Sequence, residues 1–333
     1  MTNPVLVEVS RGSLVESRHR GAVAVVDSAG ASVLALGDID RPVFPRSAVK
    51  ALQALPLIES GAADDYGDEE LAVICASHGG EPDHVEAVKR LLARSGLSPL
   101  DLECGAHWPS HADTTQTLLR QGAHPSALHN NCSGKHAGFL CLAGVLAVDH
   151  RGYGSSVHPV QQAVREAISR LTGEPLAEDR CAVDGCSVPT YAVPLKNLAL
   201  AFARFGTGGG MSQRSAAAAA RLRAACAARP WYVAGTGRFC TAIMAALGAR
   251  VFVKTGAEGV FCAAFPELGY GVALKIDDGA TRAAQAAMAA LIVRFLPLSS
   301  SERVRIEGWM RPELRNWNDI PVGRIEPAPI LRD

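Results

Sequence analysis

Hydrophobic positions near both ends of the chain follow the two-residue repeat of β-strands. Apolar residues alternate with polar ones or run together, and turn residues such as those of Asp27-Ser28-Ala29-Gly30 separate the runs. Because successive side chains of a strand point to opposite faces, this pattern predicts antiparallel strands and hairpins. The predicted strands are residues 5–10, 14–19, 21–27 and 31–37 near the start, and 250–255, 259–265 and 269–277 near the end.

The middle of the chain has longer segments that favour helices. The alanine-rich residues 213–228 are strong helix formers, and Pro230 should end that helix. The last 36 residues are rich in proline and predict irregular structure. Another predicted helix begins after Pro45, and a further one leads from the 130–139 segment through residue 148. The remaining predicted helices are residues 68–76, 82–95, 114–121, 157–171, 190–205 and 280–296.

This order of elements favours an α+β fold. Strands, then helices, then strands and a closing helix would form one antiparallel sheet from both ends of the chain, with a helical insertion between them. We expect residues 1–333 to form a single catalytic unit. Its sheet part would comprise residues 1–45 and 230–297, its mainly helical part residues 46–229, and its irregular tail residues 298–333.

Charge and composition narrow the classes of function. The 33 basic residues balance the 33 acidic ones, so no overall charge favours nucleic acid or an anionic membrane as a partner. No apolar run reaches the roughly 18 residues of a membrane span, and the first residues do not read as a secretory signal. Nine cysteines without such a signal indicate reduced thiols, and we expect a cytoplasmic protein.

Lysine is scarce in this chain, which makes its positions informative. Only six of the 33 basic residues are lysines, and the others are arginines. A genomic preference for arginine codons explains most of this bias. It would still retain lysine where an amine must lose its proton, which arginine cannot do. Three of the six lysines, Lys50, Lys135 and Lys254, lie in the motifs described below.

The first motif places Ser47 and Lys50 three residues apart at the start of a predicted helix. Side chains at this spacing share a helix face. A neutral lysine could take the proton of the serine, but lowering a lysine pKa from 10.4 to 7 costs about 4.6 kcal/mol. Burial or a neighbouring cation must supply that shift. A surface lysine on an ordinary helix would explain the same spacing.

A second motif strengthens the first. Lys254-Thr255-Gly256 ends a predicted strand. A Ser-x-x-Lys pair on a helix and Lys-Thr-Gly on a strand form the layout of serine β-lactamases and penicillin-binding proteins. The Ser-Asp-Asn element of those proteins is missing, and residues 130–136 stand roughly in its place.

Five segments together resemble a narrower family, the rhizobial-type L-asparaginases, also called asparaginase II. The resemblance covers about residues 5–300 and implies a serine β-lactamase-like fold, hydrolysis of L-asparagine to L-aspartate and ammonia, and a homodimer. The segments, in order, are PVFPRSAVKALQALPLIESGA, CASHGGEP, NNCSGKHAGFL, DGCSVPTYAVPL and KTGAEGVF.

The resemblance also implies roles for residues of these segments. It implies two Ser-Lys tandems, Ser47 with Lys50 and Ser77 with Lys254. It implies a zinc ion completed by water and neighbouring residues that bind the substrate. The implied zinc ligands are Cys132, Lys135 and Cys186, and the implied neighbours are Arg46, His136, Asp184 and Cys240.

The residues also allow simpler interpretations. Cys132 and Lys135 would share a helix face, and two thiolates suit zinc. The two cysteines could equally be small buried hydrophobes, as could Cys240. Arg46 could be a surface cation or hold a substrate carboxylate, which its geometry fits. Ser77 and His136 could simply satisfy local hydrogen bonds, and Asp184 could orient a ligand or the substrate amine.

From these residues we expect an L-asparaginase in which Ser47 is the nucleophile and Lys50 its base, with Ser77 and Lys254 relaying the proton to ammonia. The backbone N–H of Ser47 is a candidate donor to the oxyanion. Zinc would orient the substrate. Two alternatives stay open. One is a β-lactamase or peptidase-like serine hydrolase, and the other is a non-catalytic protein that binds zinc or asparagine.

Overall fold

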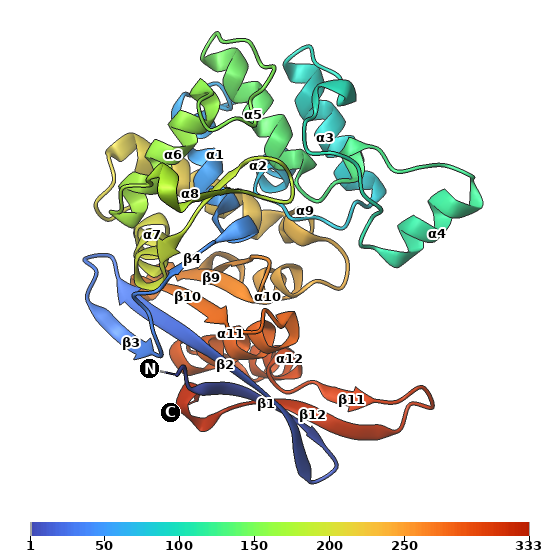
Figure 1. Ribbon diagram of the computed structural model, residues 1–333, viewed down its shortest axis with the longest axis vertical. Helices are drawn as coiled ribbons and strands as arrows, with labels where there is room; N and C mark the ends of the chain where they lie inside the picture. The colour runs from blue at the N-terminus through green and yellow to red at the C-terminus, as the bar shows by residue number, and fades with distance from the viewer. Residues whose placement is uncertain (1, 333) are drawn as a thin grey trace.

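Strand β2 (Leu14–Asp27) organises the sheet because its two halves pair with different partners. In the computed structural model, which describes residues 2–332, its first half pairs with β1 (Val5–Arg11) and its second half with β10 (Tyr270–Ile276). The register places Val7 opposite His19 and Leu274 opposite Val23. One continuous strand therefore replaces the two predicted at residues 14–19 and 21–27 (Figure 1).

The main sheet has the strand order β11-β12-β1-β2-β10-β9-β8, and β3 also pairs with β2. All of its pairs are antiparallel. Both ends of the chain therefore build one curled sheet, which confirms the predicted α+β class. The remaining strands of this sheet are β3 (Ser32–Leu36), β8 (Phe252–Thr255), β9 (Val260–Phe265), β11 (Glu313–Arg315) and β12 (Pro321–Pro327).

Helices cover both sides of the sheet. α7 packs on β2, β9 and β10, whereas α11 packs against β1, β9 and β10. Figure 1 shows α11 and α12 on one side and the larger helical group on the other. The helices are α1 (Lys50–Glu59), α2 (Asp68–Ile74), α3 (Pro82–Arg94), α4 (Ala112–Arg120), α5 (Ser133–Val145), α6 (Pro159–Thr172), α7 (Leu195–Thr207), α8 (Gln213–Ala228), α9 (Pro230–Ala234), α10 (Phe239–Leu247), α11 (Thr281–Phe295) and α12 (Ser300–Met310).

Two short strand pairs lie outside the main sheet. β4 (Pro42–Val43) pairs with β7 (Val193–Pro194), and β5 (Cys181–Val183) pairs with β6 (Pro189–Tyr191). These pairs correct the helix predicted at residues 190–205, which begins only at Leu195. Proline forces the preceding residue toward extended backbone, so Val193 before Pro194 cannot start a helix comfortably.

The C-terminal segment corrects a second prediction. Residues 298–333 were expected to be irregular, but they contain α12, β11 and β12. The hydroxyl of Ser299 accepts from the N–H of Glu302, and the Glu302 carboxylate accepts from the Ser299 N–H, so a capping box starts α12. β12 then pairs with β1. The helix predicted through residue 148 is also shorter, since α5 ends at Val145.

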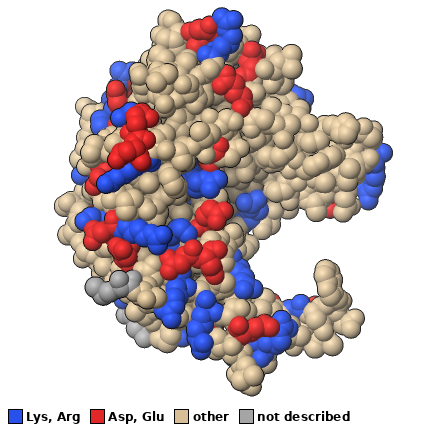
Figure 2. Space-filling view, in the orientation of Figure 1, with Lys and Arg blue, Asp and Glu red and all other residues tan. Residues whose placement is uncertain are grey.

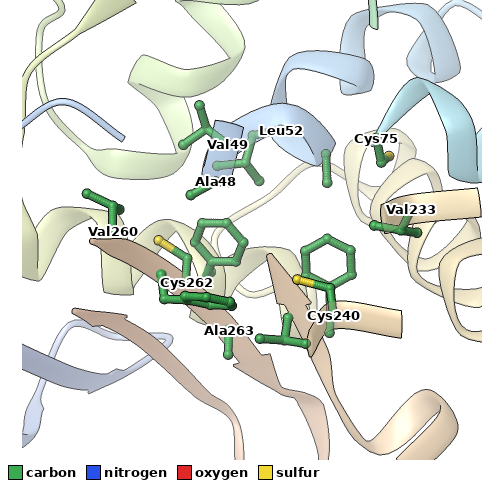
Figure 3. Packing of buried hydrophobic residues seen from close by; sticks show 14 of the residues in the cluster. Ala48, Val49, Leu52, Cys75, Val233, Cys240, Val260, Cys262 and Ala263 are labelled. Carbon is green, nitrogen blue, oxygen red and sulfur yellow. The ribbon is translucent and has the colours of Figure 1, made fainter. Parts of the chain in front are cut away.

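The core brings the start of α1 against the sheet. The 3₁₀ turn η1 (Arg46–Val49) precedes α1 and contacts β8 and β9. Figure 3 shows Ala48 and Val49 of this turn facing Val260 and Cys262 of β9. This packing holds the predicted nucleophile near the strand that carries Lys254.

The surface shows no dominance of one charge. Figure 2 shows acidic and basic side chains interleaved on the visible face, in agreement with the zero net charge, and a hollow between α4 and the β11–β12 hairpin. Within residues 2–332, no helix combines the length and the hydrophobicity that crossing a bilayer requires.

Candidate active site

A cavity of about 210 Å³ lies where η1, the start of α5 and the loop before β6 meet. Five residues of the predicted site line it, so the fold brings together segments more than 130 positions apart in the sequence. The lining residues are Arg46, Ser47, His107, Asn130, Asn131, Cys132, Asp184, Gly185, Cys186 and Ala257.

Ser47 follows a backbone conformation that L-residues rarely adopt. Arg46 has a φ of 52°, in the left-handed region. Such strain persists only where surrounding contacts enforce it, and it concentrates at functional sites. Among residues 2–332, no backbone or side-chain acceptor receives the N–H of Ser47. The half-buried Ser47 therefore presents both a hydroxyl and an unpaired N–H beside the cavity.

Arg46 and Asp184 form an ion pair at the cavity wall. Arg46 Nε donates to Asp184 Oδ1 at 2.5 Å, and the Gly185 N–H donates to the same oxygen at 2.8 Å. Burial would raise the pKa of Asp184, but the nearby charges of Lys135 and Arg46 outweigh burial and lower it. The ion pair places a carboxylate and a guanidinium side by side at the cavity.

Lys50 is fully enclosed, with 1% of its surface exposed. Its Nζ donates to the carbonyl of Ala76 at 2.6 Å and to that of Asn131 at 3.2 Å. Ala76 directly precedes Ser77, so Lys50 contacts the segment that carries the second predicted serine. Ser77 is itself buried after the end of α2, and its N–H donates to the carbonyl of Val233 at 2.9 Å.

Lys254 is the most perturbed amine of the site. It is 1% exposed on β8, and within residues 2–332 its Nζ donates only to the carbonyl of Thr255, at 3.1 Å. Burial, and then the positive charge of Lys50, lower the pKa of Lys254 to about 7. Near neutral pH this amine can therefore be uncharged, which is the state that proton acceptance needs.

The pairing of Ser47 with Lys50 and of Ser77 with Lys254 in two tandems stays a prediction. Within residues 2–332, no hydrogen bond joins the Nζ of Lys50 or Lys254 to the hydroxyl of Ser47 or Ser77. The two lysines do share one region, because the charge of Lys50 acts on Lys254. Catalytic hydrogen bonds are often long in the absence of substrate and tighten when it binds.

Cys132 and Cys186 line the cavity, and Lys135 lies beside Cys186. Lys135 Nζ donates to Cys186 Sγ at 3.0 Å, and the Cys132 thiol donates to the side-chain oxygen of Asn131 at 3.1 Å. The thiol of Cys186, then Lys50 and Lys135, lower the pKa of Cys132 against the effect of burial. The pKa of Cys186 is raised in turn, by the hydrogen bond with Cys132 and by burial.

His136 and Cys240, predicted to bind the substrate, are buried and do not belong to the cavity lining. His136 Nδ1 lies 2.7 Å from the Tyr153 hydroxyl, and its Nε2 has no partner within the described chain. Burial and the charges of Lys135 and Lys50 lower the pKa of His136. Burial raises the pKa of Cys240, and the neighbouring Lys254 opposes that effect.

Sequence reasoning missed His107, Asn131 and Ala257 as site residues. Asn131 is the most connected of them. Its N–H donates to His107 Nε2 at 2.9 Å, its carbonyl accepts from Lys50, and its side-chain oxygen accepts from the Cys132 thiol at 3.1 Å. Two signals were available: Asn131 lies in the segment NNCSGKHAGFL, and Ala257 directly follows Lys254-Thr255-Gly256. His107 lies in an irregular loop whose sequence has no periodic pattern.

The protein combines helices with an antiparallel sheet. Its candidate site has a serine and two free cysteines at the cavity, with buried lysines nearby. The chain belongs to the L-asparaginase II family, whose model matches residues 7–327. The family resemblance predicted from five segments is thereby confirmed, and family membership supports a hydrolase role. No curated protein matches the chain.

Solved structures give only distant likenesses. The structure of Mglu is 18% identical, with a TM-score of 0.42, over 85% of this chain and 69% of that chain. Mglu in its glutamate form is 17% identical, with a TM-score of 0.42, over 80% of this chain and 58% of that chain. A beta-lactamase from Mycobacterium bovis is 13% identical, with a TM-score of 0.36, over 79% of this chain and 89% of that chain. These likenesses carry no argument about function.

Proposed function

We propose that this protein is an L-asparaginase, which hydrolyses L-asparagine to L-aspartate and ammonia. The observation that carries the proposal is the match of nearly the whole chain to the L-asparaginase II family. The cavity supports it, because the Arg46–Asp184 pair offers opposite charges for the carboxylate and the ammonium group of an amino acid. The acceptor of the transferred acyl group is Ser47, which lines the same cavity.

The proposed chemistry has two stages. Ser47 Oγ attacks the side-chain amide carbon of L-asparagine while Lys50 takes the hydroxyl proton. Neutral Lys254 takes that proton over from Lys50 and passes it through Ser77 to the departing nitrogen, so ammonia leaves as the C–N bond breaks. Water then attacks the aspartyl ester, one of its protons returns to Ser47 Oγ, and L-aspartate leaves. The pKa of Lys254 near 7 supports its part, because a proton relay works best near the operating pH.

The tetrahedral oxyanion needs donors aimed at its oxygen. We assign this role to the N–H of Ser47 and to the N–H of Ala257. Both residues line the cavity, and neither N–H has an acceptor among residues 2–332. The place of Ser47 in the first turn of η1 supports the assignment, because a backbone N–H there has no partner inside the helix.

We also propose that Cys132, Lys135 and Cys186 hold a zinc ion. Within the described residues, no group of three or more His, Cys, Asp or Glu side chains is arranged to hold a metal. The proposed set has only two such side chains, both thiols, and adds an amine 3.0 Å from one of them. Sulfur and nitrogen donors beside an open cavity suit zinc. When bound, zinc would supply a positive charge that orients the substrate.

The decisive test measures ammonia release from L-asparagine and L-glutamine by the purified protein, with its metal content determined on the same sample. Ser47→Ala should lower kcat by at least about 1,000-fold, because the nucleophile is gone. Ser60→Ala, at the end of α1, is the matched control and should keep kcat. If Ser47→Ala keeps most of the kcat, Ser47 is not the nucleophile.

Assays of the same purified samples test two other functions. Hydrolysis of nitrocefin without ammonia release would indicate a β-lactamase or peptidase-like enzyme. Binding of zinc or asparagine without any turnover would indicate a sensor. A homodimer and a cytoplasmic location also stay predictions from the sequence.

A further inference from the structure

His78 is a buried histidine that the proposed chemistry does not use. Its Nδ1 accepts from the N–H of Gly80 at 3.1 Å, so the proton of the neutral ring lies on Nε2. Nε2 then donates to the hydroxyl of Ser133 at 2.9 Å, and that hydroxyl donates to the carbonyl of Leu128 at 2.9 Å. The direction of every bond in this chain is therefore fixed.

The same residue is tied to the site through its backbone. The N–H of His78 donates to the carbonyl of Asn131 at 3.2 Å, and Lys50 Nζ donates to that same carbonyl. Lys50 also donates to the carbonyl of Ala76. The residues on both sides of Ser77 are thus joined to Asn131 and Lys50.

The His78 ring is buried, and its surroundings keep it neutral. It is 1% exposed and stacks on His84 with ring centroids 4.8 Å apart, and His84 stacks on Trp231 at 4.0 Å. Burial lowers the pKa of His78 well below its ordinary value, and the charges of His84, Lys50, His107 and His129 act in the same direction. A protonated ring would also lose the bond from Gly80, since Nδ1 could no longer accept.

We infer that His78 is a positioning residue of L-asparagine hydrolysis. Its bond to Ser133 clamps residues 76–80 onto residues 128–133, and this clamp holds Ser77 and the two carbonyls that bind Lys50. The inference rests on the proposed function. Because His78 does not line the cavity, the clamp should act on the rate of the chemical step and leave substrate binding unchanged.

The test compares His78→Ala, His78→Gln and Ser133→Ala with His84→Gln. Glutamine keeps an N–H donor near the position of Nε2, whereas both alanine variants break the clamp. His84 is the matched control, because it is equally buried in the same stack but bonds to Trp231 instead. Ser133→Ala removes one hydroxyl only, so it keeps the test valid if His78→Ala does not fold.

We expect both alanine variants to lose about 10–100-fold in kcat, with KM changed less than about threefold, since small displacements of catalytic groups carry such costs. His78→Gln should recover most of the kcat, and His84→Gln should lower the melting temperature without a comparable loss of kcat. The clamp is disproved if kcat survives in Ser133→Ala, if KM rises by the same factor as kcat falls, if glutamine fails to rescue, or if His84→Gln loses as much kcat.

A measurement independent of turnover separates this inference from the proposed function. Nitrogen NMR of histidine-labelled protein should show His78 still in the neutral Nε2–H form at the pH where an ordinary histidine is half-protonated, with its Nε2 resonance shifted in Ser133→Ala. Titration of His78 near its ordinary pKa would overturn the clamp even in an active enzyme. Wild-type protein that releases no ammonia would instead overturn the proposed function, while the NMR result would still decide whether the clamp exists.

Discussion

Lys254 brings an amine into the interior at an energetic cost that depends on pH. Burial and the charge of Lys50 lower its pKa to about 7, whereas a lysine in the unfolded chain titrates near 10.5. Between these two pH values the unfolded chain binds more protons than the folded one. Folding stability contributed by this group therefore rises with pH across that window, and the full cost is present below pH 7.

We expect two results from this single residue. Lys254→Met should raise the free energy of unfolding at pH 6, by at most about 5 kcal/mol, and should have little effect of this kind at pH 10. Denaturant titrations at both pH values measure it, with the exposed Lys89→Met as control. A larger gain at pH 10 than at pH 6 would contradict the depressed pKa.

The pH dependence of kcat in the wild-type protein should report the protonation state of Lys254. If neutral Lys254 relays the proton, kcat should rise with pH through an apparent pKa near 7. Lys254→Arg, which keeps the charge but cannot deprotonate, should lose about 100-fold or more in kcat. A flat kcat between pH 5.5 and 8.5, or an active arginine variant, would remove Lys254 from the relay.

At the scale of elements, the close approach of α5 to α2 places the start of α5 beside the cavity. A Cβ on Gly134 would lie 2.1 Å from the carbonyl oxygen of Val73, and one on Gly138 would lie 2.9 Å from the side chain of Ile74. Backbone cannot yield as a flexible side chain can, so Gly134 has no tolerance for added volume. The first turn of α5, which carries Ser133 and Lys135, depends on this contact.

Gly134→Ala should therefore cost about 1–3 kcal/mol of stability and displace the Cys132–Lys135 turn. Gly144→Ala, on the same helix, is the matched control, because nothing lies within 4 Å of its added Cβ. There the better helix propensity of alanine should stabilise by up to about 1 kcal/mol. Thermal melts of both variants make the comparison. Equal effects of the two substitutions would refute the close packing of α5.

The elements show what the sequence could predict. The helix at residues 213–228 is confirmed at both ends, because alanine propensity and Pro230 act locally. Strand β2 was divided at Arg20 because the pattern there is polar, yet Gly21 lets the strand continue against β10, a partner some 250 residues away. The prediction for residues 298–333 failed for a similar reason, since β12 pairs with β1, a strand more than 300 residues away. Long-range pairing leaves little local trace.

The candidate site likewise contains residues that the sequence predicted and one that it did not. Ser47, Asp184, Cys132 and Cys186 were predicted because their side chains carry recognisable chemistry, and all four line the cavity. Asn131 was missed because it acts largely through its backbone N–H and carbonyl. Every residue has those groups, so no motif distinguishes them. The roles of the tandems and of the proposed zinc ligands still await the experiments above.

At the scale of the whole molecule, the proposed zinc ligands join the start of α5 to the loop before β6, so a bound ion should stabilise the fold as well as the substrate complex. Adding a chelator to protein that contains zinc should lower the melting temperature and chiefly raise KM. Metal content, melting temperature and kinetics measured before and after restoring zinc provide the check. Protein purified without metal, and unchanged by added zinc, would refute the zinc site.

The pairing of β1 and β2 with β12 and β10 has a consequence for biosynthesis. A ribosome releases residues 5–27 well before it releases β10 and β12, which flank them in the sheet. The nascent chain must therefore carry an open edge of β1 and of the second half of β2 until those strands have been made. Such open strand edges invite aggregation and engage chaperones, so we expect the native sheet to close only after translation has passed β12.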